Sequence, residues 1–350
     1  MEITREQFER QRHPRFGSAN PERMAVPFWE WMIRGGDQPP PADGGVLGQL
    51  GLMMRNGVLK SGYGPWRARD LFDAPPSRTE GPVWTFDRMG QTRTGLPDGR
   101  LVCVAGEHED YYDPDFHIYN DVVVLAPDGG IEIYGYPRGV FPPTDFHTAT
   151  LDGDRLVIVG CIGYPDDRVP GRTPAYALDL ATYRIDRLDA AGESPGWIGR
   201  HEAVFDPSRR AVTVRGGEVL VLQDGEQRFR RNVEEYELNL GTLAWRRTTD
   251  RNWPQYAIRR ADGKWFVLED RPDFGSFRPA EVPHEVLPPA DWNSCRLAVG
   301  RVTVRFTVGV GEVEVLVEGT LPGGTAGELV EAARRHVEAA TGTACVVEVF

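Results

Sequence analysis

Four short hydrophobic runs recur along the middle of the chain at a nearly constant spacing. Each run follows a tight turn that ends in a basic residue, and successive turns are separated by 55, 55 and 54 residues. The runs span residues 101–104, 156–159, 211–214 and 265–268. A short apolar run bounded by turn residues predicts a strand, and near-continuous apolarity predicts that both faces of the strand are covered.

Each of the first three units continues through two more predicted strands in the same order. The hydrophobic run ends in small residues, and a loop leads to a strand at 121–125, 176–179 or 236–239. A turn then leads to a last strand at 131–136, 183–188 or 243–248. Together with a first strand before each turn, this order is typical of the four-stranded blade of a propeller.

The third unit carries the residues of a known repeat. It has the diglycine Gly216-Gly217, followed by Tyr236, Asn239 and Trp245. The second unit keeps the tyrosine and an acidic residue, whereas the first unit lacks both the diglycine and the tryptophan. On these residues, the region 82–290 resembles the kelch repeats of galactose-oxidase-like β-propellers. The resemblance implies a mainly β fold of about four blades, in a family that includes both enzymes and binding modules.

The fourth unit, 253–290, is degenerate, so the ring of blades need not be complete. Residues 82–87 lie about three periods before the last strand of the third unit. They are therefore in phase with a last strand, and we expect them to pair with the fourth unit and close the ring. Closure would remove an unpaired strand edge, which is a site of aggregation.

Residues 1–80 read as a helical and loop extension. A helix is predicted from Asn20-Pro21 to the Gly35-Gly36 pair, with shorter helices at 46–54 and 65–72. Its aromatic residues predict a helical cover packed on the propeller, and the alternative is an exposed partner surface.

Residues 291–350 read as a small α+β domain of order ββαβ. Strands are predicted at 301–307 and 312–318, then a helix with a capping box at Thr325 and a stop at Gly342, then a strand at 345–350. The proline-rich stretch 279–289 is the expected linker.

Composition narrows the classes of function. The net charge of −12 argues against a nucleic-acid partner, which calls for a basic surface. No run of eighteen apolar residues predicts a membrane span, and no secretory signal is visible at the start of the sequence. Four scattered cysteines without a CxxC motif are interpreted as reduced thiols, so we expect a cytoplasmic protein.

Strand parity predicts that the long loops share one face of the propeller, and function concentrates on such loops. One of them, Glu107 to His117, holds five carboxylates, two histidines and two tyrosines. Such residues either form a solvated acidic surface or ligate a divalent metal such as Mn, Fe or Zn. The expected binding residues on this face are Glu107, His108, Asp110, Tyr112, Asp113 and Trp197.

A second group of candidates comes from register. Counting back from each turn leads to Thr92, His147, His201 and Tyr256 at the start of the innermost strands. These side chains would ring the channel mouth, where His147, His201 and His108 could ligate a metal. Glu107, Asp145 or Tyr256 could then do acid–base work. The alternative is that the histidines only bond to the neighbouring backbone.

Three functions follow, in order of preference. The first is a binding module that presents the acidic, aromatic loop face to a protein or small polar ligand. The second is a metal-dependent enzyme with a histidine and carboxylate site at the channel mouth. The third is a structural subunit that oligomerises through residues 291–350. No phosphate-binding loop, nucleophile elbow or zinc-binding helix motif is present.

Overall fold

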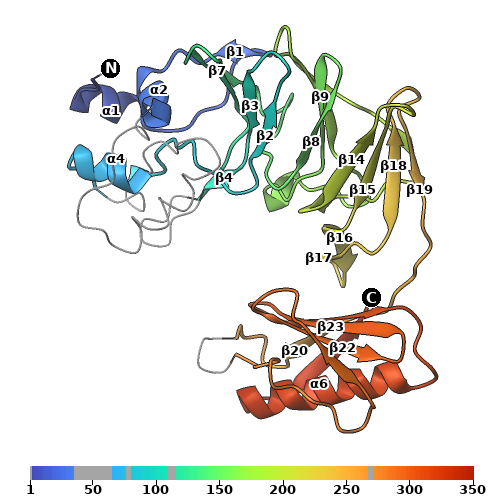
Figure 1. Ribbon diagram of the computed structural model, residues 1–350. Helices are drawn as coiled ribbons and strands as arrows, with labels where there is room; N and C mark the ends of the chain where they lie inside the picture. Colours follow the sequence, from blue (N-terminus) through green and yellow to red (C-terminus); the bar gives the residue numbers. More distant parts are fainter. Residues whose placement is uncertain (1, 35–64, 76–79, 109–115, 267–270) are drawn as a thin grey trace. The chain divides into compact units, whose positions relative to one another are not determined.

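The computed structural model describes residues 2–34, 65–75, 80–108, 116–266 and 271–350 (Figure 1). The chain is mainly antiparallel β-sheet and divides into two compact units, Met1–Thr249 and Asp250–Phe350. None of the helices in these residues has the length and apolar character of a membrane span. The four cysteines are unpaired and buried, which confirms the interpretation of their chemistry.

Three sheets, each with four antiparallel repeat strands, follow one another along the N-terminal unit, and they confirm the predicted strands of the first three repeats. The first sheet is β2 (Thr92–Gly95), β3 (Leu101–Val104), β6 (Val122–Leu125) and β7 (Ile131–Gly135). The second is β8 (Thr148–Asp152), β9 (Arg155–Val159), β10 (Ala175–Asp179) and β11 (Ile185–Arg187). The third is β14 (Glu202–Asp206), β15 (Ala211–Arg215), β18 (Glu235–Asn239) and β19 (Ala244–Arg247). No closed propeller or barrel is found among the described residues.

The three sheets follow one another in space (Figure 1). Their apolar side chains pack together between neighbouring sheets. Val102 and Val104 of the first sheet meet Leu156 and Ile158 of the second. The alternate residues of β9, Val157 and Val159, point the other way and meet Val212 and Val214 of the third sheet. Strand β9 is apolar at successive positions because both of its faces are buried. Each such side chain contributes about 1.5–3 kcal/mol of burial free energy.

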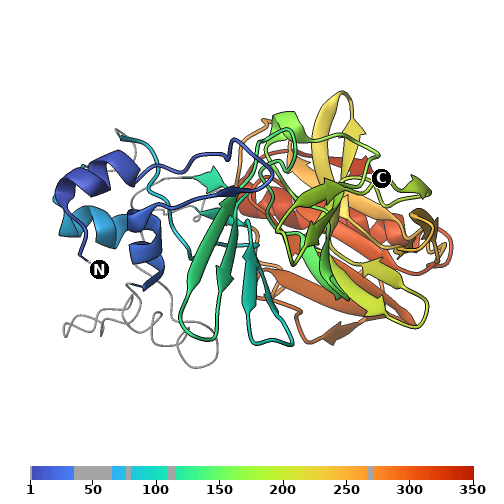
Figure 2. The same cartoon turned by 90° about the horizontal axis from the view of Figure 1, so that it is seen from above.

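The outer faces of the first and third sheets, at the two ends of this stack, are covered in different ways. The far side of the first sheet, including Cys103, Val123 and Ile133, packs under α1 (Arg5–Gln11) and α2 (Pro27–Arg34), with Ala68 of α4 (Pro65–Leu71) (Figure 2). This confirms the predicted helical cover, although α2 begins at Pro27 rather than at Asn20-Pro21. The helix predicted at 46–54 lies outside the described residues.

The far side of the third sheet is polar. Glu237 forms ion pairs with Arg209 (2.6 Å) and Arg246 (3.1 Å), and Glu202 pairs with Arg215 (3.0 Å). Thr213 occupies the alternate position of β15, between the buried Val212 and Val214. This face carries ion pairs and a threonine beside the exposed Val204 of β14, and so offers little apolar surface on which a further sheet could pack.

The outermost strand of each sheet is also covered. Strand β1 (Glu22–Arg23) pairs with β7, and β12 (Ala191–Gly192) pairs with β19. On the second sheet the side-chain amide of Asn20 replaces a strand: it donates to the Ile185 carbonyl (2.7 Å) and accepts from the Ile185 N–H (2.9 Å). The outer edge of each sheet is therefore occupied, which limits edge-to-edge association there.

Two predictions about the fourth unit are wrong. Strand β20 (Gln255–Arg260) pairs with β24 and β25 in the C-terminal unit, so residues 253–290 form no fourth sheet of the stack. The proposed closing segment, 82–87, contains no strand. Its Trp84 is buried and stacks on Trp29 of α2 with ring centroids 5.1 Å apart. The unit boundary accordingly falls after Thr249, not near residue 290.

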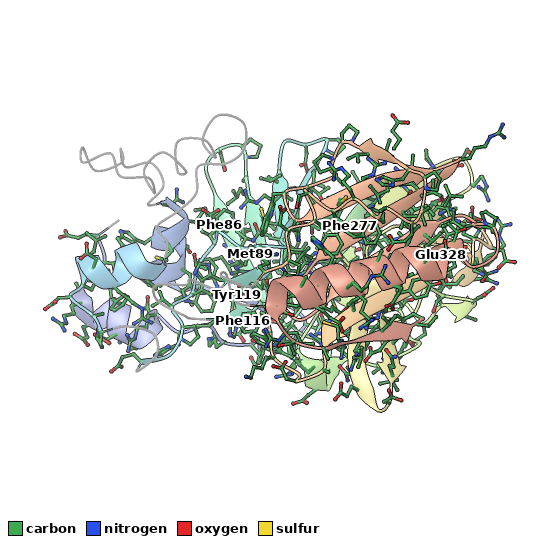
Figure 3. All side chains as sticks on the ribbon, turned by 90° about the horizontal axis from the view of Figure 1, so that it is seen from below. Phe86, Met89, Phe116, Tyr119, Phe277 and Glu328 are labelled. Carbon is green, nitrogen blue, oxygen red and sulfur yellow. The ribbon has the colours of Figure 1, made fainter. Side chains whose placement is uncertain are left out.

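The C-terminal unit is one six-stranded sheet with a helix on one face. The strand order is β21 (Glu285–Leu287), β22 (Ser294–Val299), β23 (Val302–Val308), β24 (Val313–Glu318), β20 and β25 (Cys345–Val349). Helix α6 (Thr325–Thr341) joins β24 to β25, and β20 lies between those two strands. Leu329, Ala333 and Val337 of the helix pack on the sheet, as does Phe277 (Figure 3).

The predicted ββαβ core of this unit is confirmed in β23, β24, α6 and β25. Strands β20, β21 and β22 were not predicted as part of it. The helix stops at Gly342 as expected, with a positive φ of 63°. The capping box at Thr325 is wrong, because the N-cap is Gly324 and no side chain caps the helix.

Candidate functional site

The loops that were predicted to share a face lie next to one another in the N-terminal unit. Strands β4 (Glu107–His108) and β5 (His117–Ile118) form a small hairpin in the acidic loop. The Gly106 N–H donates to the Thr144 carbonyl (2.8 Å), and the Ile162 N–H donates to the Asp145 carbonyl (3.2 Å). The loops of the first and second sheets are therefore joined by backbone hydrogen bonds.

Glu107 and Asp145 meet at this junction. Asp145 is fully buried, and its Oδ1 accepts from the Gly163 N–H (2.6 Å). Its Oδ2 is buried without an N–H or alcohol donor in the described residues. The carboxyl groups of Asp145 and Glu107 share a hydrogen bond. Two ionised carboxylates can only accept, so this contact requires one proton held between them.

Burial and a nearby cation act in opposite directions on Asp145 of this carboxyl pair. Burial raises the pKa of Asp145, while the nearby Arg168 guanidinium opposes the rise. Arg168 donates to the carbonyl oxygens of Ile162 (3.0 Å) and Gly163 (2.9 Å). Burial in turn lowers the pKa of Arg168 itself. One proton and one cation at a buried carboxyl pair suit a group that accepts and releases a proton.

His147 and His201 occupy equivalent positions, each directly before the first strand of its sheet. The Nε2 atom of His147 is 2.8 Å from the Thr92 hydroxyl, and that of His201 is 3.0 Å from the Thr148 hydroxyl. Both threonines begin the first strand of the preceding sheet. Each histidine therefore joins its own sheet to the one before it.

The backbone beside these histidines repeats as well. Phe146 and Arg200, the residues before them, both have positive φ angles, 46° and 55°. The Phe146 N–H donates to the Gly90 carbonyl (3.0 Å), and the Arg200 N–H donates to the Phe146 carbonyl (2.8 Å). A Cβ on Gly90 would lie 2.3 Å from the Phe146 nitrogen, so this link requires glycine there.

Both histidines are held neutral. Burial lowers the pKa of His147 to about 3 and that of His201 to about 4. Their Nδ1 atoms are buried and make no hydrogen bond in the described residues. These histidines bond to neighbours, but the backbone partner expected in the alternative is wrong, because each partner is a threonine hydroxyl.

The predicted metal ligands are not brought together. His108 lies on β4, where its Nδ1 is 3.3 Å from the Asp87 carbonyl. His147 and His201 are each hydrogen-bonded to a threonine hydroxyl. Within the described part of the chain, no three histidine, cysteine, aspartate or glutamate side chains could hold a metal ion.

The remaining predicted residues have other places. Trp197 is only 4% exposed, and its indole N–H donates to the Ile162 carbonyl (3.0 Å), so it is not an exposed binding contact. Tyr256 lies on β20 in the C-terminal unit, opposite Val315 and Val349, and is not part of a histidine cluster. Asp110, Tyr112 and Asp113 lie outside the described residues.

Two exposed apolar side chains beside the acidic loop were not predicted from the sequence. Met89 is 51% exposed and forms a β-bridge with Glu107; Phe116, just before β5, is 47% exposed (Figure 3). Phe116 contacts the edge of the Tyr164 ring, and the Tyr164 hydroxyl accepts from the Ile118 N–H (2.9 Å). The pairing of Met89 with Glu107 has no local sequence signal.

A buried ion pair lies next to the hairpin of β4 and β5. Arg88 pairs with Asp121, which also accepts from the Trp84 indole N–H (2.8 Å). The guanidinium carbon of Arg88 lies 3.4 Å from the centre of the Tyr119 ring. Burial lowers the pKa of neighbouring His117 to about 4, and the charge of Arg88 adds to this effect.

Comparison with protein-family models and with curated proteins finds no match. The kelch resemblance therefore depends on the residues of the repeat alone. The site itself consists of a carboxyl pair, a basic residue and two exposed apolar side chains on adjoining loops.

Proposed function

We propose that residues 82–249 are an open, kelch-like propeller segment of three blades. The support is the repetition of a four-stranded sheet, with first strands β2, β8 and β14 side by side. The turn before each last strand of the second and third sheets also repeats: Asp179 accepts from the Thr182 N–H, and Asn239 from the Thr242 N–H.

On this scaffold, the acidic loop face is a binding site for a partner protein that presents an arginine-rich segment. The observation that carries this proposal is the presence of two exposed apolar side chains, Met89 and Phe116, beside a loop with five carboxylates. Guanidinium groups pair with carboxylates, and their planar faces pack on exposed apolar and aromatic side chains.

The histidines argue for binding rather than metal chemistry. Both rings are used to link neighbouring sheets, so they stabilise the scaffold that carries the loops. The carboxyl pair has a similar role, since Glu107 starts the hairpin and Asp145 belongs to the loop that supports it. Their shared hydrogen bond fixes the position of the acidic loop.

The test is binding of the full-length protein to short peptides measured by fluorescence anisotropy. We expect arginine-rich peptides to bind at least about tenfold more tightly than lysine-rich peptides of equal charge. Neutralising Asp110, Asp113 and Asp115 together should abolish this preference. Phe116→Ser should weaken the arginine peptide about threefold to tenfold, because it removes an exposed packing surface.

The matched control neutralises three exposed acidic residues elsewhere in the same unit, Asp186, Asp189 and Glu226. This variant has the same net charge as the loop variant and should bind like the wild type. Equal loss of binding in both variants would mean that only overall charge matters, which would contradict a site on the loop face.

A further inference from the structure

The C-terminal unit contains a cleft of about 460 Å³ that opens from its core. Its floor is formed by Phe274, Cys295 and Val308, each less than 5% exposed. Trp292, which is 82% exposed, and Val286, which is 41% exposed, stand at its rim. This volume lies in the range of small-molecule sites, and exposed apolar side chains around an apolar floor mark such sites.

A cation that has no acidic partner among the described residues lines this cleft. The guanidinium carbon of Arg271 lies 4.6 Å from the centre of the Trp292 ring. Arg271 donates to the Val308 carbonyl (2.9 Å) and forms no ion pair with any described residue. The stacked ring holds the guanidinium in one orientation, while other N–H groups of its planar fork remain for a carboxylate.

A carboxylate that has no partner in the described part of the chain lines the same cleft. The carboxylate of Asp291 makes no hydrogen bond or ion pair within the described ranges. Asp273, the other carboxylate of the lining, is different: it accepts from the Gly275 N–H (2.9 Å) and the Ser276 hydroxyl (3.0 Å). Arg271 and Asp291 therefore offer one positive and one negative group that do not neutralise each other.

We propose that this cleft binds a small zwitterion of the α-amino-acid type with an aromatic side chain. Arg271 receives its carboxylate and Asp291 receives its ammonium group. The side chain packs on the floor of Phe274, Cys295 and Val308, beside Trp292. The proposal concerns the C-terminal unit alone and does not depend on the function proposed for the acidic loop face.

An extended peptide is a poorer fit to the same place. The neighbouring edge strand, β21, has only three residues, Glu285–Leu287. Prolines at 283, 288 and 289 flank it closely. Short edge strands beside prolines resist the addition of a further strand. The interior of a peptide also carries no adjacent ammonium and carboxylate for the two charged side chains.

The test measures binding of three related compounds to the full-length protein by isothermal titration calorimetry. They are L-phenylalanine, 3-phenylpropionate, which lacks the ammonium group, and phenethylamine, which lacks the carboxylate. We expect L-phenylalanine to bind at least about tenfold more tightly than either of the other two.

Two substitutions assign the charged contacts. Arg271→Gln should weaken L-phenylalanine at least about fivefold and leave phenethylamine unchanged. Asp291→Asn should weaken L-phenylalanine to a similar extent and leave 3-phenylpropionate unchanged. Both side chains are solvent-accessible, so the variants should keep the thermal unfolding transition of the wild type.

The matched control is a second exposed tryptophan of the same unit, Trp265, which is 72% exposed and lies outside the cleft. Trp292→Ala should weaken binding of L-phenylalanine, and Trp265→Ala should not. The proposal is overturned if L-phenylalanine shows no binding at about 10 mM. It is also overturned if the three compounds bind equally, or if the two tryptophan variants lose binding equally.

Discussion

His147 and His201 each hold a neighbouring sheet through one hydrogen bond to a threonine hydroxyl. Their rings are almost completely enclosed, so an imidazolium would be buried without an anion beside it. Repetition of the same contact at two successive sheets makes it a structural element of the repeat. A buried neutral histidine also makes the stability of the fold depend on pH.

We expect the N-terminal unit to lose stability in mild acid. The pKa of His147 is lowered to about 3 and that of His201 to about 4, whereas histidines in the unfolded chain titrate near 6.5. The unfolded chain therefore takes up protons first. The contribution of both rings is complete above about pH 6.5 and falls by about 1.4 kcal/mol per histidine per pH unit below it.

Urea unfolding between pH 8 and pH 4 measures this slope. His201→Gln keeps a hydrogen-bonding side chain but cannot be protonated, so its stability should fall less steeply than that of the wild type. His13→Gln is the control, because His13 is exposed and should leave the slope unchanged. A wild-type slope in His201→Gln would show that its ring is not a source of the acid sensitivity.

The carboxyl pair should act in the opposite direction. Burial raises the pKa of Asp145, so the folded protein keeps a proton that the unfolded chain has lost. The contribution of the pair is greatest below about pH 4 and falls as the pH rises through the raised pKa of Asp145. Glu107→Gln supplies an amide N–H to Asp145 without a shared proton, and should weaken this dependence while Asp145 stays buried.

The difference in unfolding free energy between Glu107→Gln and the wild type isolates this effect from that of the histidines. The variant should gain on the wild type as the pH rises from about 4 to 8. Glu226→Gln, at an exposed glutamate of the same unit, should show a constant difference. A constant difference for Glu107→Gln would contradict a shared proton.

Among the elements, strand β15 shows how the residue at one position decides whether another sheet can pack on that face. Val212 and Val214 pack on the second sheet, while Thr213 between them faces the polar side with Glu237. In β9 the equivalent position is apolar because a third sheet covers it. The stack therefore ends at β15, and its stability comes from the inner faces.

Two leucines of the third repeat differ in burial and provide a test of this packing. Leu238 is fully buried between the second and third sheets, and Leu222 of strand β16 (Glu218–Gln223) is 60% exposed. We expect Leu238→Ala to cost about 2–5 kcal/mol of unfolding free energy and Leu222→Ala less than about 0.5 kcal/mol. Thermal and urea unfolding measure both, and similar losses would contradict the described packing.

The same strands show what the sequence could predict. The turns and apolar runs located the four repeat strands of each of three sheets, because those signals are local, but not the added edge strands β1 and β12. The threonine at 213 already indicated that β15 has one covered face, but the run was interpreted as covered on both. The carboxyl pair was predicted only as two separate candidates, since the contact between Glu107 and Asp145 depends on how two loops meet.

At the scale of the whole molecule, the strand pairing of β20 decides where the chain divides into its two units. This strand follows the third repeat directly and keeps the turn pattern of the repeat, so its local sequence predicted a fourth blade. Its actual partners, β24 and β25, lie roughly 55 to 95 residues further along the chain. No local pattern identifies strand partners at that separation.

The position of β20 gives a prediction about fragments. Residues 250–350 should fold alone and unfold cooperatively, because the fragment contains the whole sheet and its helix. Residues 291–350 should not, because they lack the strand between β24 and β25 and the buried Ile258. Circular dichroism during heating distinguishes them, and a cooperative transition in the shorter fragment would contradict this account.

Helices cover the outer face of the first sheet, and ion pairs occupy the outer face of the third. Of the three sheets, only the middle one packs against another sheet on both faces. A duplicated repeat would therefore be tolerated as an insertion after the second sheet, where each new surface meets an apolar neighbour. The same repeat appended after the third would meet charged arginines and glutamates. Lengthening of this array, in the laboratory or by gene duplication, is therefore expected to proceed from its interior.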